Sequence, residues 1–405
     1  MLSTSYKRCL PIALLFLPLL SMARPYPGAS GLVASADSAR TAGTNPAGIT
    51  RLGDERSWRA DLYGIASRST WESEVGDLER SSRSSTDLLV PALSLVQPLS
   101  ENWFFGFTFL GVGYSDDLGD WPGRYFLESY DSVTVSAFPS IAYRINDRWS
   151  VAASLSASYS RYEQDRAVAN LFDPGLPDGS ASLDVDGFDV GFGLSLLYEY
   201  SDRTRWGLAY LSEQNPEMDG KVKYSGLGPN TESVLLEAGV IGSTVEVRSV
   251  TPQTVTAGVY HEFPNNHAFT VDLAWSDFSS FELSEFYVDG EQLTFNETAW
   301  EDTLALSASY SWPVSPRWML GVSGLYVDDM IEDDLRTVAL RLDSIWSLGL
   351  GAEWQWREDR ALQFSVSYMD LGEAPVTTPE ITGIGGISGK YTERDLWLFT
   401  LGVDF

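Results

Sequence analysis

The chain has little of the chemistry that enzymes and disulfide-stabilised proteins use. Its 405 residues include one cysteine and two histidines, His261 and His267. A single cysteine forms no internal disulfide, and two histidines that flank one turn do not supply a nucleophile, a base and an orienting group. Basic residues are scarce too, with 27 Lys and Arg against 56 Asp and Glu and a net charge of −29. Nucleic-acid binding requires clustered Lys and Arg, so that class of partner is excluded.

Long apolar runs are also missing. No segment reaches the ~20 consecutive apolar residues of a membrane-spanning helix. The first 23 residues instead have the features of a cleaved secretory signal, with basic Lys7 and Arg8, an apolar run that ends at Leu20, and small residues before a cut after Ala23. Cleavage removes the cysteine and changes the net charge from −29 to −31. Intrinsic disorder is excluded by the 44% apolar and 13% aromatic content.

A secreted chain without a spanning helix is either soluble or a β-barrel of an outer membrane. Its dominant pattern is strict alternation, in which one face is apolar and the other is small or polar. Val151–Ser160, Phe269–Ser276, Leu304–Trp312 and Trp346–Trp356 show it most clearly. A period of two predicts strands.

The alternation predicts fourteen antiparallel strands, with tryptophans gathered near their ends. Most have about 10–16 residues, which exceeds the usual 5–6 of soluble sheets and suits the ~9–11 of a spanning strand. Length and the aromatic girdle favour a transmembrane barrel over a soluble sandwich. The predicted strands are 56–69, 85–97, 101–115, 132–145, 148–162, 185–200, 203–213, 249–262, 266–278, 299–312, 316–327, 337–356, 360–370 and 391–405.

The connections between these strands alternate between short and long. The short ones carry Pro, Asn, Asp or Ser, which favour turns, and all fall at one end of the barrel, whereas the long ones fall at the other. Short periplasmic turns and long outer loops are the rule in bacterial barrels, and a soluble sandwich has no reason to sort its loops in this way. The short turns are Pro98–Glu101, Asn146-Asp147, Ser201-Asp202, Pro264-Asn265, Pro313–Ser315 and Glu358-Asp359.

The acidic charge sorts in the same way. The long connections with their adjoining strand tips carry a net charge of −28, so the acidity belongs to the outer surface. It solvates the loops there, or it bridges divalent cations to anionic lipopolysaccharide. The densest group, Asp328-Asp329 with Asp333-Asp334, has no ordered ligand spacing, and we predict neither a metal site nor a cofactor.

Residues 28–52 read GASGLVASADSARTAGTNPAGITRL, a run of small residues that leads into Asn45, Pro46, Ala47 and Gly48. This stretch resembles the N-terminus of the FadL-type outer-membrane transporters of long-chain fatty acids and hydrophobic hydrocarbons, whose barrel has fourteen strands. The resemblance covers essentially the whole mature chain. It continues at Leu197-Tyr198-Glu199, Arg205–Tyr210, Thr251-Pro252-Gln253, Tyr326–Asp329, Ser367-Tyr368-Met369 and Lys390–Phe405.

The resemblance implies three domains: a signal peptide at 1–23, a hatch that plugs the lumen at 24–54, and the barrel at 55–405. Asn45, Pro46, Ala47 and Gly48 would form the gate, with Asn45 hydrogen-bonded to the wall. On the residues alone, the hatch segment is equally well interpreted as a disordered periplasmic leader with an ordinary Asn-Pro turn.

The family's lateral opening lies at a kink in the third strand. That strand contains Gly106, Gly111 and Gly113, and glycine inside a strand often marks a bend; Gly106 is the preferred kink. The alternative is that the glycines fit a crowded interior. A typical proline after the Asp-Asp pair is replaced by Met330-Ile331-Glu332, and the loop 163–184 is short, so loop shape and substrate capture differ from the family pattern.

Outer capture is expected from apolar residues in the acidic loops, since exposed apolar patches require an explanation. The alternative is a small local loop core. The candidates are Leu171, Phe172, Leu235, Leu236, Val240 and Ile241.

The C-terminal Phe405 ends an alternating strand and resembles the signal read by the barrel-assembly machinery. The predicted protein is a monomer in the outer membrane of a Gram-negative bacterium, in contact with its lipid and lipopolysaccharide. Its predicted function is passive uptake of hydrophobic compounds by lateral diffusion, without catalysis. The alternative is a general porin or a structural barrel.

Overall fold

The computed structural model describes residues 31–73, 81–248, 250–283, 285–289, 291–293, 300–329, 331, 336, 338, 343–357, 360–378 and 385–405. Four predicted features lie outside the described residues: the signal peptide at 1–23, positions 24–30 of the hatch, the Glu358-Asp359 turn and the Asp333-Asp334 pair. Within those ranges no helix is long and apolar enough to cross a membrane.

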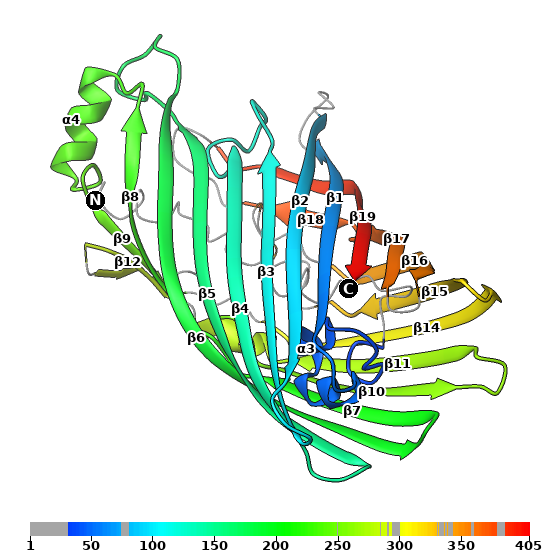
Figure 1. Ribbon diagram of the computed structural model, residues 1–405. Helices are drawn as coiled ribbons and strands as arrows, with labels where there is room; N and C mark the ends of the chain where they lie inside the picture. Colours follow the sequence, from blue (N-terminus) through cyan, green and yellow to red (C-terminus); the bar gives the residue numbers. More distant parts are fainter. Residues whose placement is uncertain are drawn as a thin grey trace.

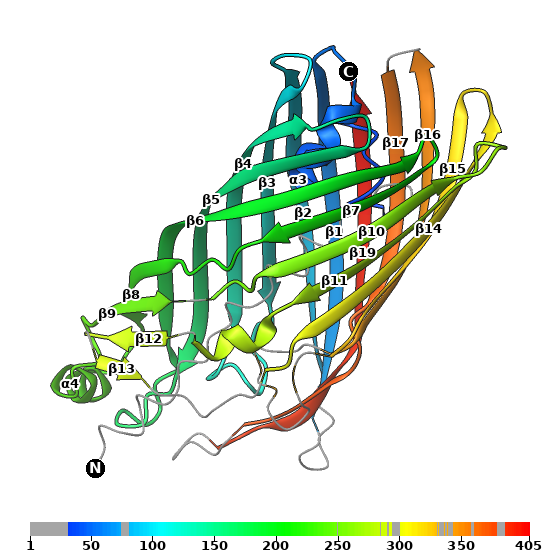
Figure 2. The same cartoon turned by 90° about the horizontal axis from the view of Figure 1, so that it is seen from below.

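Fourteen antiparallel strands close into one barrel, which confirms the predicted fold class (Figures 1 and 2). The ring closes where the first and last strands pair, from Arg59–Asp404 to Ser73–Gly389. The barrel strands are β1 (Ser57–Ser73), β2 (Ser81–Pro98), β3 (Trp103–Asp117), β4 (Ser129–Arg144), β5 (Trp149–Val168), β6 (Gly179–Ser201), β7 (Thr204–Leu211), β10 (Thr254–Glu262), β11 (Ala268–Ser276), β14 (Thr303–Ser315), β15 (Trp318–Val327), β16 (Ile345–Arg357), β17 (Arg360–Asp370) and β19 (Ser388–Asp404).

The alternating pattern places large apolar side chains outside and small polar ones inside. In β16, Leu348 and Leu350 are each 62% exposed. Ser347, which lies between Trp346 and Leu348 in sequence, is 4% exposed. A large apolar residue facing outward next to a buried serine is the reverse of a soluble sheet, and it gives the barrel an apolar outer band that suits lipid.

Aromatic pairs mark both edges of this band. Near the short turns, Trp103 packs on Tyr143, Trp149 on Tyr198 and Trp318 on Trp354. Near the long loops, Tyr368 lies between Trp346 and Trp397. Two separate aromatic belts agree with the two interfaces of a bilayer.

The long loops contain regular structure that alternation alone did not predict. The strands β5 and β6 extend past the other strands, and the overhanging part of β6 pairs with β8, which continues the sheet to β9, β12 and β13. Figure 2 shows this sheet projecting beyond the barrel beside α4. The additional elements are β8 (Glu217–Ser225), α4 (Pro229–Glu237), β9 (Thr244–Arg248), η2 (Phe278–Leu283), β12 (Glu285–Val288), β13 (Glu291–Leu293) and β18 (Ala374–Thr377).

The N-terminal segment lies within the barrel as a compact body, coloured blue in Figure 1. It contains the short helix α3 (Thr41–Thr44) and the 3₁₀ helix η1 (Pro46–Arg51). Their small side chains pack at the end of the barrel that carries the short turns, against Phe104, Ala142 and Leu197. The segment therefore fills the lumen at this end.

Candidate functional site: hatch, interrupted ladder and cavity

Asn45 ties the hatch to the barrel wall. Its fully buried side chain donates to the Val33 carbonyl over 2.6 Å and to the Leu196 carbonyl of β6 over 3.1 Å, and it accepts from the Ala47 N–H over 3.1 Å. Ala47 N–H also donates to Ser195 Oγ over 3.0 Å. One amide side chain thus fixes the fold of the hatch and its contact with β6.

The other residues of this motif set the packing of η1. Pro46 begins the 3₁₀ helix, where a missing N–H costs no hydrogen bond. A Cβ on Gly48 would lie 2.8 Å from Ala36 Cβ and 2.8 Å from Thr41 Cγ2, so only glycine lets these turns approach.

A buried ionic network anchors the hatch at the seam between β1 and β19. Arg40 of the hatch contacts Asp61 of β1 at 2.5 Å; Arg59 contacts Asp61 and Asp404 of β19, each at 2.7 Å. Burial lowers the pKa of Arg40, but the Asp61 carboxylate outweighs it, so the net shift is upward and Arg40 stays charged. Arg59 and Asp61 share one face of a strand, and that pairing of opposite charges is a sequence signal for this network that apolar alternation does not reveal.

A further anchor lies at the start of the described hatch. Asp272 of β11 accepts the N–H groups of Gly31 and Leu32 over 2.5 and 3.0 Å. Gly258 on β10 leaves room for this carboxylate, because a Cβ there would be 1.9 Å from Asp272 Oδ1. On β7, which pairs with β10, Arg205 donates to the carbonyl of Ala34 over 2.7 Å.

The ladder between β2 and β3 is incomplete. It runs from Pro98–Phe104 to Ala92–Leu110 and stops there, although β3 continues to Asp117 and stays paired with β4. The next residue of β2 beyond the Ala92–Leu110 pair, in the direction away from the short turn, is Pro91, which has no N–H to donate. One stretch of wall thus has strands on both sides with no ladder hydrogen bonds between them in the part of the chain that the structure describes.

The three predicted kink glycines lie on different sides of Leu110, where the β2–β3 ladder ends. Gly106 lies in the paired section, where a Cβ would meet Ala42 of the hatch at 3.0 Å. Gly111 and Gly113 lie beyond the last pair; Cβ atoms there would lie 3.6 Å from Val90 Cγ1 and 3.1 Å from Leu88 Cδ2. Gly106 therefore makes room for the hatch and Gly113 makes room for Leu88, whereas a side chain at Gly111 would make only ordinary contact with Val90.

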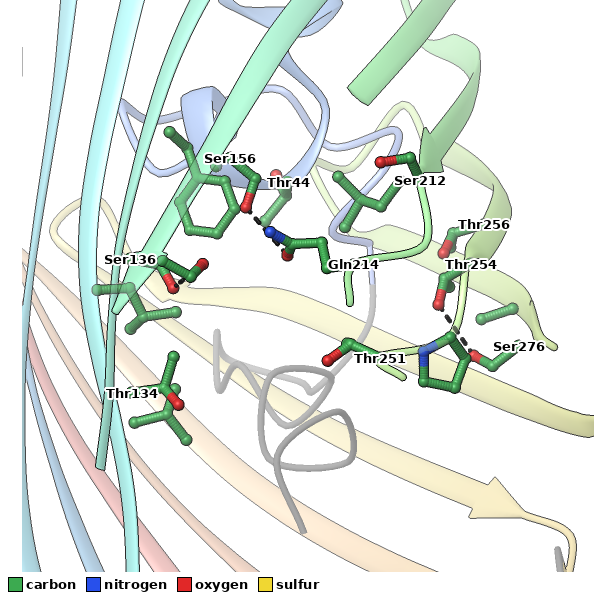
Figure 3. Close-up of a pocket in the computed structure, with 18 of the residues that line it drawn as sticks. Thr44, Thr134, Ser136, Ser156, Ser212, Gln214, Thr251, Thr254, Thr256 and Ser276 are labelled. Atoms are coloured by element: carbon green, nitrogen blue, oxygen red, sulfur yellow. Dashed lines mark hydrogen bonds between the residues drawn. The ribbon is translucent and has the colours of Figure 1, made fainter. Parts of the chain in front are cut away.

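A cavity of about 260 Å³ lies between the hatch and this stretch of wall. Its lining includes Leu32 and Thr44 from the hatch, and Leu110 and Val112 from the point at which the β2–β3 ladder ends. Figure 3 shows hydroxyl-bearing side chains on two sides of the space, with Gln214 between them. The cavity joins the floor made by the hatch to the interrupted wall.

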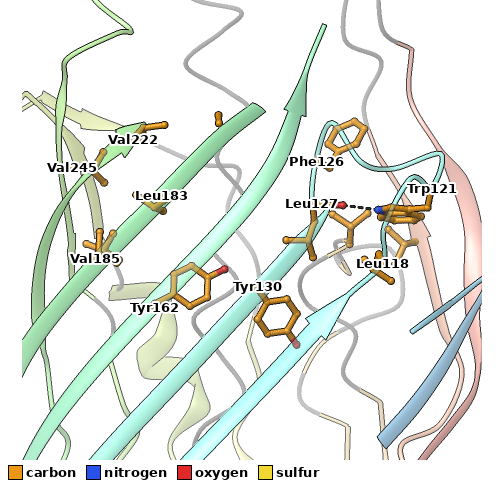
Figure 4. Close-up of a cluster of buried hydrophobic side chains, with 14 of the residues drawn as sticks. Leu118, Trp121, Phe126, Leu127, Tyr130, Tyr162, Leu183, Val185, Val222 and Val245 are labelled. Carbon is orange, nitrogen blue, oxygen red and sulfur yellow. Dashed lines mark hydrogen bonds between the residues drawn. The ribbon is translucent and has the colours of Figure 1, made fainter. Parts of the chain in front are cut away.

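Apolar and aromatic side chains form a buried cluster at the outer end of the barrel. In the β3–β4 loop, Leu118, Trp121 and Leu127 are buried (Figure 4). Trp121 packs on Trp71 with ring centroids 5.4 Å apart, and its indole N–H donates to the Leu127 carbonyl over 2.5 Å. Trp71 in turn contacts Tyr391 at 4.7 Å.

The structure brings the predicted capture loops together. Asp173 accepts the Thr231 N–H over 2.7 Å and the Asn230 N–H over 3.2 Å, which docks the β5–β6 loop onto the first turn of α4. Leu171, Phe172 and Leu236 are exposed, and Val240 and Ile241 are half-buried. Leu235, on the buried side of α4, is 4% exposed. Exposed and buried apolar side chains thus coexist in this region.

The two histidines and the C-terminus occupy simple structural positions. His261 lies 2.8 Å from Thr204 Oγ1 and His267 lies 2.6 Å from the Tyr310 hydroxyl. Phe405 is half-exposed, and its backbone exchanges two hydrogen bonds with Trp58, which completes the seam at the short-turn end.

A closed fourteen-stranded barrel, a lumen filled by the chain's own N-terminal segment, and a cavity beside an interrupted ladder define an outer-membrane transport barrel. The chain belongs to the family described as "Outer membrane protein transport protein (OMPP1/FadL/TodX)", which matches residues 21–405. This is a family of transporters rather than of enzymes, and its barrels lie in the outer membrane.

Curated and solved relatives agree with this assignment. The "Long-chain fatty acid transport protein" of Escherichia coli O6:H1 strain CFT073 is 25% identical over 403 residues, covering 91% of this chain and 89% of that protein. A Pseudomonas aeruginosa FadL homologue has a TM-score of 0.80 at 16% identity, covering 95% of this chain and 99% of that one. The P. putida toluene transporter TodX has a TM-score of 0.66 at 14% identity, covering 92% and 97%.

Proposed function

We propose that this protein is a passive outer-membrane channel for hydrophobic compounds, such as long-chain fatty acids or aromatic and aliphatic hydrocarbons, which leave the lumen sideways into the bilayer. The observation that carries the proposal is the end of the β2–β3 ladder at Leu110, where the cavity lining also begins. Unpaired backbone at membrane depth is costly and is tolerated where it lines a protein cavity. A functional opening explains that cost.

The chemistry of the substrate favours this route. An apolar molecule gains nothing from a water-filled pore, because its surface prefers an apolar wall or the bilayer. The side chains over the interruption, Leu88 and Val90, are aliphatic, and the outer face of the barrel beside them is apolar. A solute that reaches Leu110 therefore finds a continuous apolar surface leading outward.

The hatch blocks the route straight through the lumen to the short-turn end. We propose that Asn45, Pro46, Ala47 and Gly48 hold the gate, with Asn45 as its latch to β6. Their contacts with the wall support a fixed plug more than a disordered leader or an open general porin. Compounds that enter from outside would then be stopped above the hatch and directed to the interrupted wall.

Capture at the outer surface is proposed for the exposed apolar residues Leu171, Phe172 and Leu236, which Asp173 holds in one region. Further partners are proposed on sequence grounds: lipopolysaccharide at the acidic loops, and the barrel-assembly machinery at Phe405. A monomer suits a barrel that closes its own sheet.

A reversible staple tests the lateral route. The mature chain contains no cysteine if cleavage follows Ala23, and the Gly111 Cβ position lies 3.6 Å from Val90 Cγ1, close to disulfide geometry. The double substitution Val90→Cys with Gly111→Cys should abolish uptake of a labelled fatty acid or toluene by whole cells when oxidised, and reduction should restore it.

The matched control is Leu93→Cys with Phe109→Cys, a pair inside the intact ladder. Its oxidation should leave uptake unchanged. Equal uptake by the oxidised Val90–Gly111 staple and the control would refute the lateral route. Uptake of neither compound by the unmodified protein, together with steady ion conductance of an open pore, would support the porin instead.

A further inference from the structure

Three arginines lie close together on one sector of the short-turn rim, and we refer to Arg317, Arg357 and Arg360 as the arginine cluster. Arg357 ends β16 and Arg360 begins β17, and the two are directly opposite each other in the ladder. Arg317 lies in the neighbouring β14–β15 turn, where its carbonyl accepts the Gln355 N–H over 2.9 Å. Opposite residues of antiparallel strands share one face of a sheet, so two positive charges lie side by side at this edge.

The register places Arg357 and Arg360 on the lipid-facing side of the sheet. Arg360 is two residues from Leu362, which pairs with Trp354. Trp354 stacks on Trp318 in the aromatic belt near the short turns, with ring centroids 5.8 Å apart. Because alternate residues of a strand lie on the same face, Arg360 and its partner Arg357 share the face of this belt. The pair therefore lies at the edge of the apolar outer band.

An indole ring contacts both members of the pair. The Cζ atoms of Arg357 and Arg360 lie 4.9 and 5.7 Å from the centroid of the Trp356 ring. Such cation–π contacts are worth about 0.5–1 kcal/mol at exposed sites, which helps to hold two like charges that repel each other. A negative group bound beside the ring would relieve the remaining repulsion.

The described acid nearest in sequence to this pair faces the lumen. Glu353 accepts from Gln363 over 2.7 Å, and Gln363 is 4% exposed. The turn 313–317 contains no acid, whereas Glu358 and Asp359, between the two arginines in sequence, lie outside the described residues. Three arginines against these two acids leave this sector of the rim with a positive charge.

Apolar side chains continue from the arginines toward the middle of the membrane. Val322, Leu350 and Phe364 are exposed on the outer face of β15, β16 and β17. Val322 and Leu350 are opposite each other, as are Ala352 and Phe364 on the next pair of strands. A cationic edge followed by an apolar face matches the phosphate and the acyl chains of a lipid, in that order.

We propose that the arginine cluster binds the phosphate of an anionic phospholipid, such as phosphatidylglycerol, in the periplasmic leaflet of the membrane. Guanidinium groups bind phosphate oxygens bidentately, and the acyl chains lie along the apolar outer face of β15–β17. The bound lipid holds this sector of the rim at the level of the headgroups. The site lies outside the lumen and apart from the β2–β3 interruption, so it does not depend on which cargo the channel carries.

The test measures lipid binding to the full barrel after delipidation in detergent. Native mass spectrometry counts the lipids retained from an equimolar mixture of phosphatidylglycerol and phosphatidylcholine with identical acyl chains. The parent should prefer phosphatidylglycerol at least about tenfold, the effect of about one hydrogen bond to a charged group. No preference in the parent would overturn the proposal, as would displacement of the lipid by inorganic phosphate at the same concentration.

Two triple variants separate the arginine cluster from a generally basic rim. Replacing all three of its arginines by glutamine should remove most of the preference. The matched control, Arg56→Gln with Arg148→Gln and Arg203→Gln, removes the same charge from exposed arginines elsewhere on this rim and should keep it. An equal loss in both variants would show non-specific attraction and contradict the proposal.

A conservative variant tests the role of the guanidinium fork. Replacing the cluster by lysines keeps the three charges but loses bidentate binding, so we expect a preference between those of the parent and the glutamine variant. Heat-modified mobility in gels checks that each variant is a folded barrel. A folded glutamine variant that keeps the parent preference would place the lipid elsewhere and overturn the proposal.

Discussion

The hatch and the β3–β4 loop, at the two ends of the barrel, are held by different balances of polar and apolar contacts. At the short-turn end, the hatch is held by the ion pair of Arg40 with Asp61, by the hydrogen bond that Asn45 donates to β6, and by the hydrogen bond that Asp272 accepts from Gly31. At the outer end, the β3–β4 loop combines the buried packing of Trp121 against Trp71 with polar contacts nearer the surface, such as the ion pair between Arg124 and Asp178. Buried directed contacts fix one position, whereas an apolar ligand can replace apolar packing at little cost. The comparison teaches that the outer closure is suited to yield to substrate and the inner one to resist it.

The largest effect is expected from breaking the ionic anchor. Asp61→Ala leaves Arg40 and Arg59 buried without their shared carboxylate, and breaking a buried pair in this way costs about 3–5 kcal/mol. The hatch should loosen, with a lower unfolding midpoint in the gel-shift assay and a rise in ion conductance in planar bilayers. Asp54→Ala, an exposed acid next to the hatch, is the control. Parent-like conductance and midpoint in Asp61→Ala would show that the network does not hold the hatch.

The outer closure should respond differently. Trp121→Ala removes a fully buried aromatic side chain, a change that costs about 3–5 kcal/mol in a core. Because the loss falls on one loop, we expect faster cleavage within residues 118–128 and faster uptake, with conductance unchanged. Trp149→Ala in the lipid-facing belt is the matched control. Slower uptake would mean that Trp121 guides substrate rather than blocking it.

A smaller effect is expected at the latch. Asn45→Ala removes two donated hydrogen bonds and one accepted one, and leaves the Val33 carbonyl without its donor. A loss of about 1–3 kcal/mol follows, visible as increased hydrogen exchange of hatch amides and brief conductance steps. Asn215→Ala, on an exposed loop, should change neither. If exchange rises but conductance does not, Asn45 stabilises the hatch without gating it.

The smallest effect is expected at the capture loops. Burial raises the pKa of Asp173, but hydrogen bonds from Thr231 and Asn230 outweigh it and keep the pKa below its usual value. The contact is therefore complete above about pH 4 and weakens as the pH falls through the lowered pKa. Asp173→Ala should free α4, measured as faster proteolysis of 226–243 at pH 7. Asp202→Ala in a short turn is the control, and equal proteolysis in both would exclude this docking role.

The barrel could be predicted because its signal is local. Each spanning strand repeats the same alternation, so residues 346–356 identify one strand without knowledge of its neighbours. The outer sheet could not be predicted in this way: β8 and β9 are ordered by pairing with the overhanging part of β6, which is a long-range contact. Short strands in an acidic loop carry too little pattern of their own.

The contacts of the site also differ in whether a local sequence pattern predicts them. The contact of Asn45 could be predicted because its motif is continuous in sequence, and its amide lies against β6 in the structure. The Asp272 anchor joins residues that are 241 positions apart, and nothing near either one indicates the contact. The same holds for the interrupted ladder, where Pro91 on one strand meets the end of pairing at Leu110 on another.

The ionic network at the seam also couples the closure of the ring to the position of the hatch. Arg59 joins β1 to β19 through Asp404, and the same cluster receives Arg40 from the hatch. A barrel that closed with its hatch outside would seal Asp61 and Arg59 at the seam without Arg40. The closed seam therefore favours the inserted hatch, and by the same contacts the inserted hatch favours the closed seam, so the two parts of the molecule stabilise each other.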